Sequence, residues 1–318
     1  MPELPEVETI CRTLAPMLVG SAFARAELVW PGCVANGSAS DFEASLAGSL
    51  CTGISRRGKY LLIALDHSRW LGVHLRMTGR FTMMDGGADR DRHVRAVLHL
   101  KDGRELHFID QRKFGRLALA IGVDGLRHFL RRLGPEPVID DARTSHLEPG
   151  HDGERGGPGF EQVPNPDFMT SASLAARFSG RRAPIKSLLL DQKSVAGLGN
   201  IYVDEALFRA CIHPLRSAGS LGAAEIGNLC HAIHDALAQG IENRGTTLSD
   251  YRDALGESGS NQAKLLVFRR NGKPCPVCGT DIIRLRVSAR GTHVCPRCQV
   301  DPTELSAPLN PPKPTRTQ

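Results

Sequence analysis

The sequence predicts an α+β protein of several domains, in which an N-terminal helix and a β-sandwich precede a helical domain and a cysteine-bearing β-hairpin. Three observations indicate this order. Residues 5–18 carry apolar side chains at helical spacing, residues 20–122 contain short apolar runs, and residues 167–243 return to helical spacing. A chain of 318 residues is long enough for about two domains with their own cores.

The first helix is predicted from the stretch MPELPEVETI and the residues that follow it. Pro5 is tolerated in the first turn of a helix, and Glu6 and Glu8 lie where the positive end of the helix dipole favours acids. The apolar face of this helix is formed by Val7, Ile10, Cys11, Leu14 and Leu18.

The β-sandwich is predicted from apolar runs such as YLLIAL (60–65) and WLGVHL (70–75), which are typical of strands. Residues 94–109 are predicted to form a hairpin, because Asp102-Gly103 is a turn signal between two apolar runs. Several short strands within about one hundred residues favour a sandwich or a barrel.

Changes in composition give the expected domain boundaries. The segment 133–166 is rich in Gly, Pro and charge and is expected to be a linker, whereas the polar segment 246–264 is expected to be a surface loop. The expected units are an N-terminal domain (2–132), the linker (133–166), a helical domain (167–264), a cysteine-bearing finger (265–300) and a tail too polar to fold (301–318).

The finger contains two Cys-x-x-Cys pairs, CPVC (275–278) and CPRC (295–298), separated by sixteen residues. This spacing is typical of structural zinc ribbons. Four thiolates leave no open position on the metal, so the site is expected to be structural and not catalytic. The predicted ligands of one Zn²⁺ are Cys275, Cys278, Cys295 and Cys298.

Composition limits the partners. Lysine and arginine number 40 against 34 acidic residues, a net charge of +6 that suits a polyanion. No apolar run approaches the roughly 20 residues that span a bilayer, and the acidic first residues are unlike a signal peptide. The sequence therefore predicts a cytoplasmic protein with no membrane partner. Its isolated cysteines are expected to be reduced core residues: Cys11, Cys33, Cys51, Cys211 and Cys230.

The residues after Met1 carry candidate chemistry. If Met1 is removed, as is usual before a small residue, Pro2 becomes an N-terminal secondary amine. A free α-amino group has a pKa of roughly 7.7–8.0, which the helix dipole would lower further, so part of it is neutral near pH 7. Such an amine can attack the anomeric carbon of a sugar and form an iminium, with Glu3 as proton donor. Taken alone, the stretch is as consistent with prolines that only stiffen the helix entry.

Several motifs occur together in one order: PELPEVET, RRGKYLL (56–62), HLRMTG (74–79), DQRKFG (110–115), GLGNIYVDEALF (197–208) and RGTHVCPRCQ (290–299). Together they closely resemble the formamidopyrimidine-DNA glycosylase family of base-excision repair, from residue 2 to about residue 299. The resemblance implies that the helical region contains a helix–two-turns–helix motif and that the cysteine-bearing hairpin is a zinc ribbon.

The resemblance also implies catalytic roles. Pro2 matches the Schiff-base nucleophile of the family and Glu3 its proton donor in base release. Lys59 matches the lysine assigned as proton donor in β-elimination, although read alone it would be a solvated lysine at a strand edge. Arg290 matches the arginine of the zinc hairpin that grips phosphates and is assigned to δ-elimination.

Further residues match DNA-binding positions of the family. Asn200 follows a Gly-rich turn that opens a helix, a ready anion site that the family uses to clamp a phosphate. Lys186 matches another phosphate-facing lysine, and His93, Arg112 and Arg182 match DNA-binding positions.

An enzyme that acts on a base must extrude it from the stack and fill the gap. Met77, Arg112 and Phe114 match the family's filling residues, and their position in strand-end turns favours exposure.

The chain departs from the family pattern in three places. Gln111 and Lys113 replace a proline and an arginine, which keeps the charge. The lesion-capping loop has GESGSNQAK (256–264) where the family carries Gly-Tyr-Phe, so no base contact is assigned there. Residues 140–165 resemble an insertion without an assigned role.

The expected function is a bifunctional glycosylase and AP lyase that removes oxidised purines, 8-oxoguanine and formamidopyrimidines, and cleaves the strand by β,δ-elimination. The expected partner is damaged double-stranded DNA, bound by a monomer in the bacterial cytoplasm at the nucleoid. Two alternatives remain: an activity on oxidised pyrimidines like that of endonuclease VIII, and a non-catalytic lesion-binding paralogue. The motif PELPEVET, Arg112 and Phe114 favour the purine branch, and Pro2, Glu3 and Lys59 favour catalysis.

Overall fold

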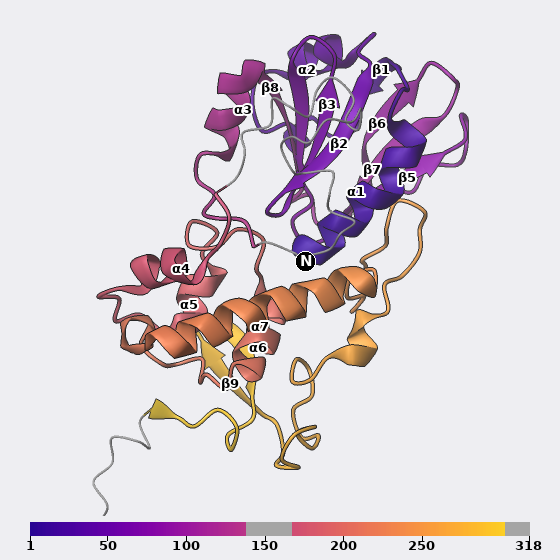
Figure 1. The fold of residues 1–318 in the computed structure, drawn as a ribbon. Helices are drawn as coiled ribbons and strands as arrows, with labels where there is room; N and C mark the ends of the chain where they lie inside the picture. The colour runs from indigo at the N-terminus through magenta and orange to yellow at the C-terminus, as the bar shows by residue number, and fades with distance from the viewer. Residues whose placement is uncertain (138–166, 303–318) are drawn as a thin grey trace, which may run out of the picture.

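The computed structural model describes residues 1–137 and 167–302. The predicted insertion (140–165) and nearly all of the predicted tail lie outside the described residues. Figure 1 shows a sheet-containing N-terminal part and a helical C-terminal part, with the N-terminus at the junction between them. The predicted α+β fold of helix, sandwich, helical region and C-terminal hairpin is confirmed.

The N-terminal part starts with α1 (Leu4–Leu18) and contains two antiparallel four-stranded sheets. The first sheet has the order β2-β3-β4-β8, and the second has the order β1-β6-β7-β5. The predicted hairpin is β6 paired with β7, and it turns at Asp102-Gly103. The strands are β1 (Phe23–Glu27), β2 (Cys51–Arg57), β3 (Tyr60–Leu65), β4 (Arg69–His74), β5 (Gly79–Met84), β6 (Val94–Leu100), β7 (Glu105–Asp110) and β8 (Arg116–Ile121).

The unbroken apolar run of β3 is explained by burial on both faces. Leu61 and Ile63 point into the core between the sheets, which α1 and α2 (Ala39–Leu46) also line. Leu62 points to the opposite face, where α3 (Gly122–Leu130) covers the sheet with Leu126. A strand buried on both faces needs apolar residues at every position, so the period-two alternation is lost.

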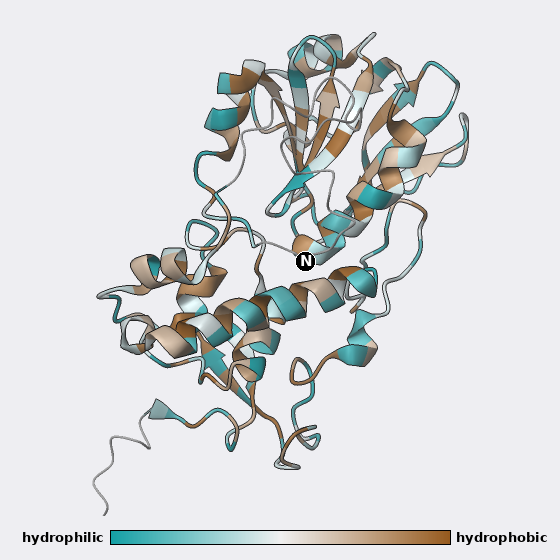
Figure 2. Ribbon diagram, viewed as in Figure 1, coloured by the Kyte–Doolittle hydropathy of each residue, from teal (hydrophilic) through white to brown (hydrophobic). Residues whose placement is uncertain are grey.

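The helical part is built around two helices, α6 (Asn200–Arg209) and α7 (Ala223–Glu242), which pack against each other. The shorter α4 (Ser171–Phe178) and α5 (Ile185–Leu190) complete the core. Leu4 at the start of α1 belongs to this same core, so the first residues of the chain connect the two parts. In Figure 2, α7 carries both apolar and polar bands, as expected of a helix with one packed face and one solvent-facing side.

The C-terminal hairpin consists of β9 (Ile283–Val287) and β10 (Arg290–Val294), paired antiparallel. Its two-residue turn, Ser288 and Ala289, has positive φ at both positions (48° and 60°), which matches the twist of the flanking strands. Short 3₁₀ turns lie at Pro31–Cys33, Ala218–Ser220 and Asn261–Lys264.

Three local expectations are wrong. Cys211 is exposed at the end of α6, whereas Cys11, Cys33, Cys51 and Cys230 are buried as predicted. The segment 246–264 is only partly a surface loop, because Thr246, Asp253, Ala254 and Asn261 are buried.

The start of the predicted linker is likewise packed into the protein. Glu136 is buried, and its carboxylate pairs with Arg56 and Arg57 of β2. In the described part of the chain, no helix is both long and apolar enough to cross a membrane.

Candidate active site

Pro2 and Glu3 lie at the junction of the two parts, directly before α1. Both are buried, whereas Met1 is about half exposed, with 49% of its surface accessible. The backbone N–H of Leu4 donates to the carbonyl of Gly197 at 3.0 Å, which fixes the start of the chain against the turn before α6. The proline nitrogen is thereby placed at a fixed point between the sandwich and the helical part.

The carboxylate of Glu3 occupies the N-terminus of α6. Its Oε2 accepts from Gly199 N at 2.8 Å, and its Oε1 accepts from Ile201 N at 3.0 Å. A Cβ at position 199 would lie 2.3 Å from the Glu3 carboxyl carbon, so glycine is required for this approach. The free amides and the dipole of the helix stabilise an acid here. The sequence analysis expected an anion at this turn, and in this structure the carboxylate of Glu3 accepts from its amides.

Lys59 lies in the turn between β2 and β3, and only 5% of its surface is exposed. The reading of Lys59 as a solvated lysine at a strand edge is therefore wrong. Burial lowers its pKa, and the nearby Arg290 and Arg76 lower it further, while Glu3 and Glu6 oppose this shift. Glu3 and Arg290 are thus both among the charges that act on the pKa of Lys59.

Glu6 is a member of the site that the sequence analysis assigned only to the helix dipole. It is buried, and its carboxylate accepts from Glu3 N at 2.7 Å, from the Tyr202 hydroxyl at 2.8 Å and from Thr246 N at 2.7 Å. Burial first, and then the charge of Glu3, raise the pKa of Glu6 to about 7. The signal that could have found it is the spacing of Glu3 and Glu6, which brings the two acids together in one helix turn.

His74 is a second neighbour that the sequence did not assign. It ends β4, and its Nδ1 accepts from Arg76 N at 3.1 Å. Burial, with help from the charges of Arg76 and Lys59, lowers its pKa to about 3, so the ring is neutral near pH 7.

A pocket opens beside Pro2 and Glu6. Its walls come from the start of α1, the β4–β5 loop, the first turn of α6 and the segment that follows α7. The lining residues are Met1, Pro2, Glu6, Met77, Thr78, Gly79, Ile201, Thr246, Leu248, Ser249, Asp250 and Tyr251.

The three predicted gap-filling residues lie on two neighbouring loops. Met77 is in the β4–β5 loop and 41% exposed, whereas Phe114 is in the β7–β8 loop and 46% exposed. Arg112 is also exposed, and its guanidinium lies 5.0 Å from the centre of the Phe114 ring. Large apolar side chains so exposed at loop tips are available to a partner.

The predicted phosphate-binding residues divide into exposed and buried ones. Arg290 at the start of β10 and Arg182 before α5 are exposed, and His93 is half-buried. Asn200 begins α6 and donates from Nδ2 to the carbonyl of Gly291 at 2.9 Å, and its Oδ1 has no hydrogen-bond partner among the described residues.

Lys186 differs from its prediction. It is fully buried, and its Nζ donates to Asp204 Oδ1 at 2.6 Å. Burial lowers the pKa of Lys186, which Asp204 opposes. The ammonium group has no accessible surface, so in this geometry it holds α5 to α6 and does not face a phosphate. Asp204 also accepts from His293 N of β10 at 2.9 Å, which connects the same pair to the hairpin.

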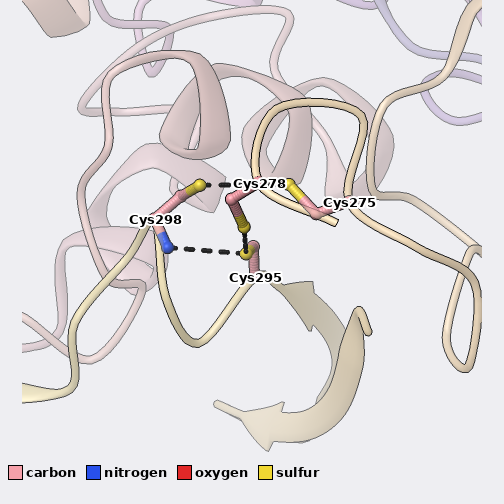
Figure 3. Close-up of side chains that lie close together, drawn as sticks. All are labelled: Cys275, Cys278, Cys295 and Cys298. Atoms are coloured by element: carbon pink, nitrogen blue, oxygen red, sulfur yellow. Dashed lines mark hydrogen bonds between the residues drawn. The ribbon is translucent and has the colours of Figure 1, made fainter. Parts of the chain in front are cut away.

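The four cysteines predicted as metal ligands come together, as Figure 3 shows. Their sulfurs all lie within 4.8 Å of one another, with Cys275 to Cys298 at 3.9 Å and Cys278 to Cys295 at 3.4 Å. A tetrahedron with Zn–S bonds of about 2.3 Å has S···S edges of about 3.8 Å, so the four sulfurs fit one zinc ion. Cys275 and Cys295 pack with Phe208 of α6, which anchors the finger to the helical part.

Comparison with known proteins agrees with this architecture. Residues 1–117 match the family model of the formamidopyrimidine-DNA glycosylase N-terminal domain, residues 162–252 match that of its H2TH domain, and residues 272–300 match the zinc finger found in FPG and IleRS.

Two curated relatives and two solved structures show the extent of the similarity. The formamidopyrimidine-DNA glycosylases of Symbiobacterium thermophilum and Herpetosiphon aurantiacus are each 46% identical, over 95% and 94% of this chain and 90% and 100% of their own. A Lactococcus lactis Fpg variant bound to Fapy-dG DNA is 33% identical with a TM-score of 0.81. The same enzyme with abasic-site DNA has a TM-score of 0.80, and both structures cover 94% of this chain and 100% of their own.

The helix with its β-sandwich, the helix–two-turns–helix domain and the four-cysteine finger define a zinc-finger DNA glycosylase of DNA repair. The chain belongs to the formamidopyrimidine-DNA glycosylase family, and its finger carries one structural zinc.

Proposed function

We propose that this glycosylase is bifunctional: it excises oxidised purines from duplex DNA as a monomer and then cleaves the strand as an AP lyase. The observation that carries the proposal is the position of Pro2 in a pocket between the two parts of the molecule, with Glu3 beside it on the amides of α6. Lys59 is buried in the β2–β3 turn, where the charge of Glu3 acts on its pKa. The residues before α1 and the β2–β3 turn thus supply three groups able to act as nucleophile, acid and proton carrier.

The first step uses Pro2 as a free amine, with Met1 removed. Its nitrogen forms a bond to C1′ of the damaged nucleotide while Glu3 protonates the ring oxygen of the sugar, so the bond from C1′ to that oxygen breaks and the ring opens. The bond from C1′ to the base then breaks, the base leaves with the proton of the proline nitrogen, and an iminium joins Pro2 to C1′. The placement of Glu3 on the amides of α6 supports this role, because it holds the carboxyl group beside the start of the chain.

The second step is elimination from the iminium. Loss of a proton from C2′ expels the 3′ phosphate oxygen, and Lys59 is the proposed proton donor to the leaving group. Its lowered pKa supports the role, since a buried ammonium gives up its proton more readily than a solvated one. We assign the grip on the flanking phosphates and the δ-elimination to Arg290. Arg112, Arg182, His93 and Asn200 are proposed as further DNA contacts.

Lys186 enters this proposal in a changed role. Because it is buried against Asp204, we assign it to positioning the zinc hairpin that presents Arg290, rather than to direct contact with a phosphate.

A second candidate substrate class is oxidised pyrimidines. One matching structure is a complex between the Lactococcus lactis enzyme and DNA that contains an oxidised pyrimidine, so the fold accommodates both classes of base in that protein. A panel of duplexes, each with one lesion opposite each of the four bases, distinguishes the two classes by their excision rates.

Substitution of Glu3 by Gln tests the assignment of steps. The variant keeps the amine but loses the proton donor, so we expect it to lose excision of 8-oxoguanine by at least about 100-fold. It should still nick a preformed abasic site, where no base has to depart. Gel assays of both substrates measure the two activities, and normal base excision by this variant would refute the role of Glu3.

A further inference from the structure

The gap-filling residues come from two separate loops, yet a buried carboxylate joins those loops. We propose that Asp110 is a positioning residue that, through the hydroxyl of Thr78, makes Met77, Arg112 and Phe114 enter the DNA as one unit. This inference rests on the proposed function, since a gap forms only when a base is extruded.

The contacts of Asp110 connect both loops. Asp110 ends β7 and is fully buried. Its Oδ1 accepts from the hydroxyl of Thr78 at 2.5 Å and from Arg112 N at 3.2 Å, while its Oδ2 accepts from Gly115 N at 2.7 Å. Thr78 follows Met77 directly, and Arg112 and Gly115 lie on either side of Phe114. One side chain therefore bonds to Arg112 itself and to the residues that follow Met77 and Phe114.

The hydroxyl of Thr78 has a second contact that closes the link. Its Oγ1 accepts from Arg112 N at 3.1 Å while it donates to Asp110. A hydroxyl can donate one bond and accept others, so threonine satisfies both partners. The next residue, Gly79, is paired with Asp110 across β5 and β7, which keeps the two loops in register.

The carboxylate of Asp110 accepts hydrogen bonds from the two loops and, in the part of the chain that the structure describes, pairs with no cation. Among the described residues its carboxylate has no ion pair, and Arg95, the nearby cation, donates to its backbone carbonyl instead. Burying a carboxylate without a cation is unfavourable unless hydrogen bonds replace its hydration. Its lone pairs are therefore committed to the three donors of the two loops, which argues for a task at those loops.

The β7–β8 loop is held on its other side too. Arg116 donates to the carbonyls of Lys113 and Gly115 and stacks on Trp30 at 5.7 Å. A Cβ at position 115 would lie 2.5 Å from the Phe108 ring, so the loop packs closely. The β7–β8 loop thus has contacts of its own, and the side chain of Thr78 bonds the β4–β5 loop to it.

Coupling between Met77 and Phe114 tests the proposal. We would measure lesion extrusion by the fluorescence of 2-aminopurine beside 8-oxoguanine in stopped flow, for Met77→Ala, Phe114→Ala and the double variant. If the loops act together, the double variant loses less than the product of the two single losses, by roughly threefold or more. In a Thr78→Val background the hydroxyl is gone and the two losses should multiply. Thr78→Ser keeps a hydroxyl and should restore the coupling.

Asp110→Asn is the second test. The side-chain amide nitrogen of asparagine is a donor, so it cannot accept from the N–H of Gly115 or from the donors of the other loop. It should abolish the coupling as Thr78→Val does, with both variants checked for folding by circular dichroism. Losses that already multiply in the unsubstituted background, or coupling that persists in Thr78→Val and Asp110→Asn, would overturn the proposal. Failure of the proposed function has a different signature: the unsubstituted protein would give no extrusion signal on lesion DNA.

Discussion

At the scale of single residues, burial shifts the pKa values of the ionisable groups around Pro2 away from those usual for their residue types. Glu6 and Lys59 would both be ordinary surface residues by sequence, yet both are nearly inaccessible to solvent. Burial raises the pKa of the acid to about 7 and lowers that of the lysine. Both shifts favour the neutral forms, which reduces the cost of collecting ionisable groups at one place.

The raised pKa of Glu6 makes stability depend on pH in a defined direction. An acid with a folded-state pKa of about 7, against an ordinary value of 4.5, binds its proton more tightly in the folded chain. Its contribution is therefore complete below about pH 4.5 and is lost as the pH rises to about 7. Urea unfolding from pH 5 to 7.5 should show a decrease on the order of 1–3 kcal/mol, and Glu6→Gln should remove most of it.

The exposed acid Asp124 is the matched control for Glu6. Its side chain is 96% accessible, so Asp124→Asn should leave the pH dependence of the free energy of unfolding as it is in the unsubstituted protein. If the free energy of unfolding of Glu6→Gln falls with pH as steeply as that of the unsubstituted protein, another group is responsible for the pH dependence.

The positions of some of these residues can be predicted from the sequence, whereas those of others cannot. The exposure of Met77 and Phe114 follows from their position in turns after strands, and the cysteine ligands follow from spacing alone. The burial of Lys59 and the seat of Glu3 on α6 do not follow. The bond from Gly199 to Glu3 joins residues 196 positions apart, so local pattern carries no information about it.

At the scale of elements, α6 connects the rest of the molecule. Its N-terminus receives Glu3, Asp204 pairs with Lys186 and His293, and Glu205 accepts from the backbone N–H groups of 266–268. Its sequence, NIYVDEALFR, predicts the helix but does not predict that its acidic side chains are buried. Burial raises the pKa of Glu205, opposed by those backbone bonds. Two acids that look solvated in sequence thus position the finger.

The β9–β10 hairpin gives the prediction that belongs to this scale. If Arg290 holds one phosphate, Arg290→Ala should weaken binding to damaged and undamaged duplex alike. The slope of log K against log salt should become shallower by roughly 0.9, because one fewer counterion is released. Fluorescence anisotropy at salt concentrations from about 50 to 200 mM measures the slope.

Arg127 on α3 is the matched control for Arg290, because it is an exposed arginine far along the fold from the finger. Arg127→Ala should leave the slope unchanged. An Arg290→Ala slope equal to that of the unsubstituted protein would refute the phosphate assignment.

At the scale of the whole molecule, the two parts meet through buried polar contacts and through Leu4 of α1, which packs into the core of the helical part. Glu3 and Glu6 bond to α6 and to Thr246, and Glu136, at the start of the predicted linker, pairs with Arg56 and Arg57 of β2. The order of the parts is readable from hydrophobic periodicity, since each has its own core. Their relative placement is not, because it depends on a few side chains that pack or hydrogen-bond across the junction between residues distant in sequence. The proposed active site lies at that junction and needs both parts.

The most direct measurement of this account is the identity of the atom that attacks the sugar. Borohydride should reduce the iminium formed on an 8-oxoguanine duplex, and mass spectrometry of the trapped protein should locate the sugar fragment on the N-terminal peptide that begins with Pro2. Protein purified with Met1 retained should give no adduct, because the proline nitrogen is then an amide. An adduct on Lys59 or another lysine, or none with protein that starts at Pro2, would contradict the account.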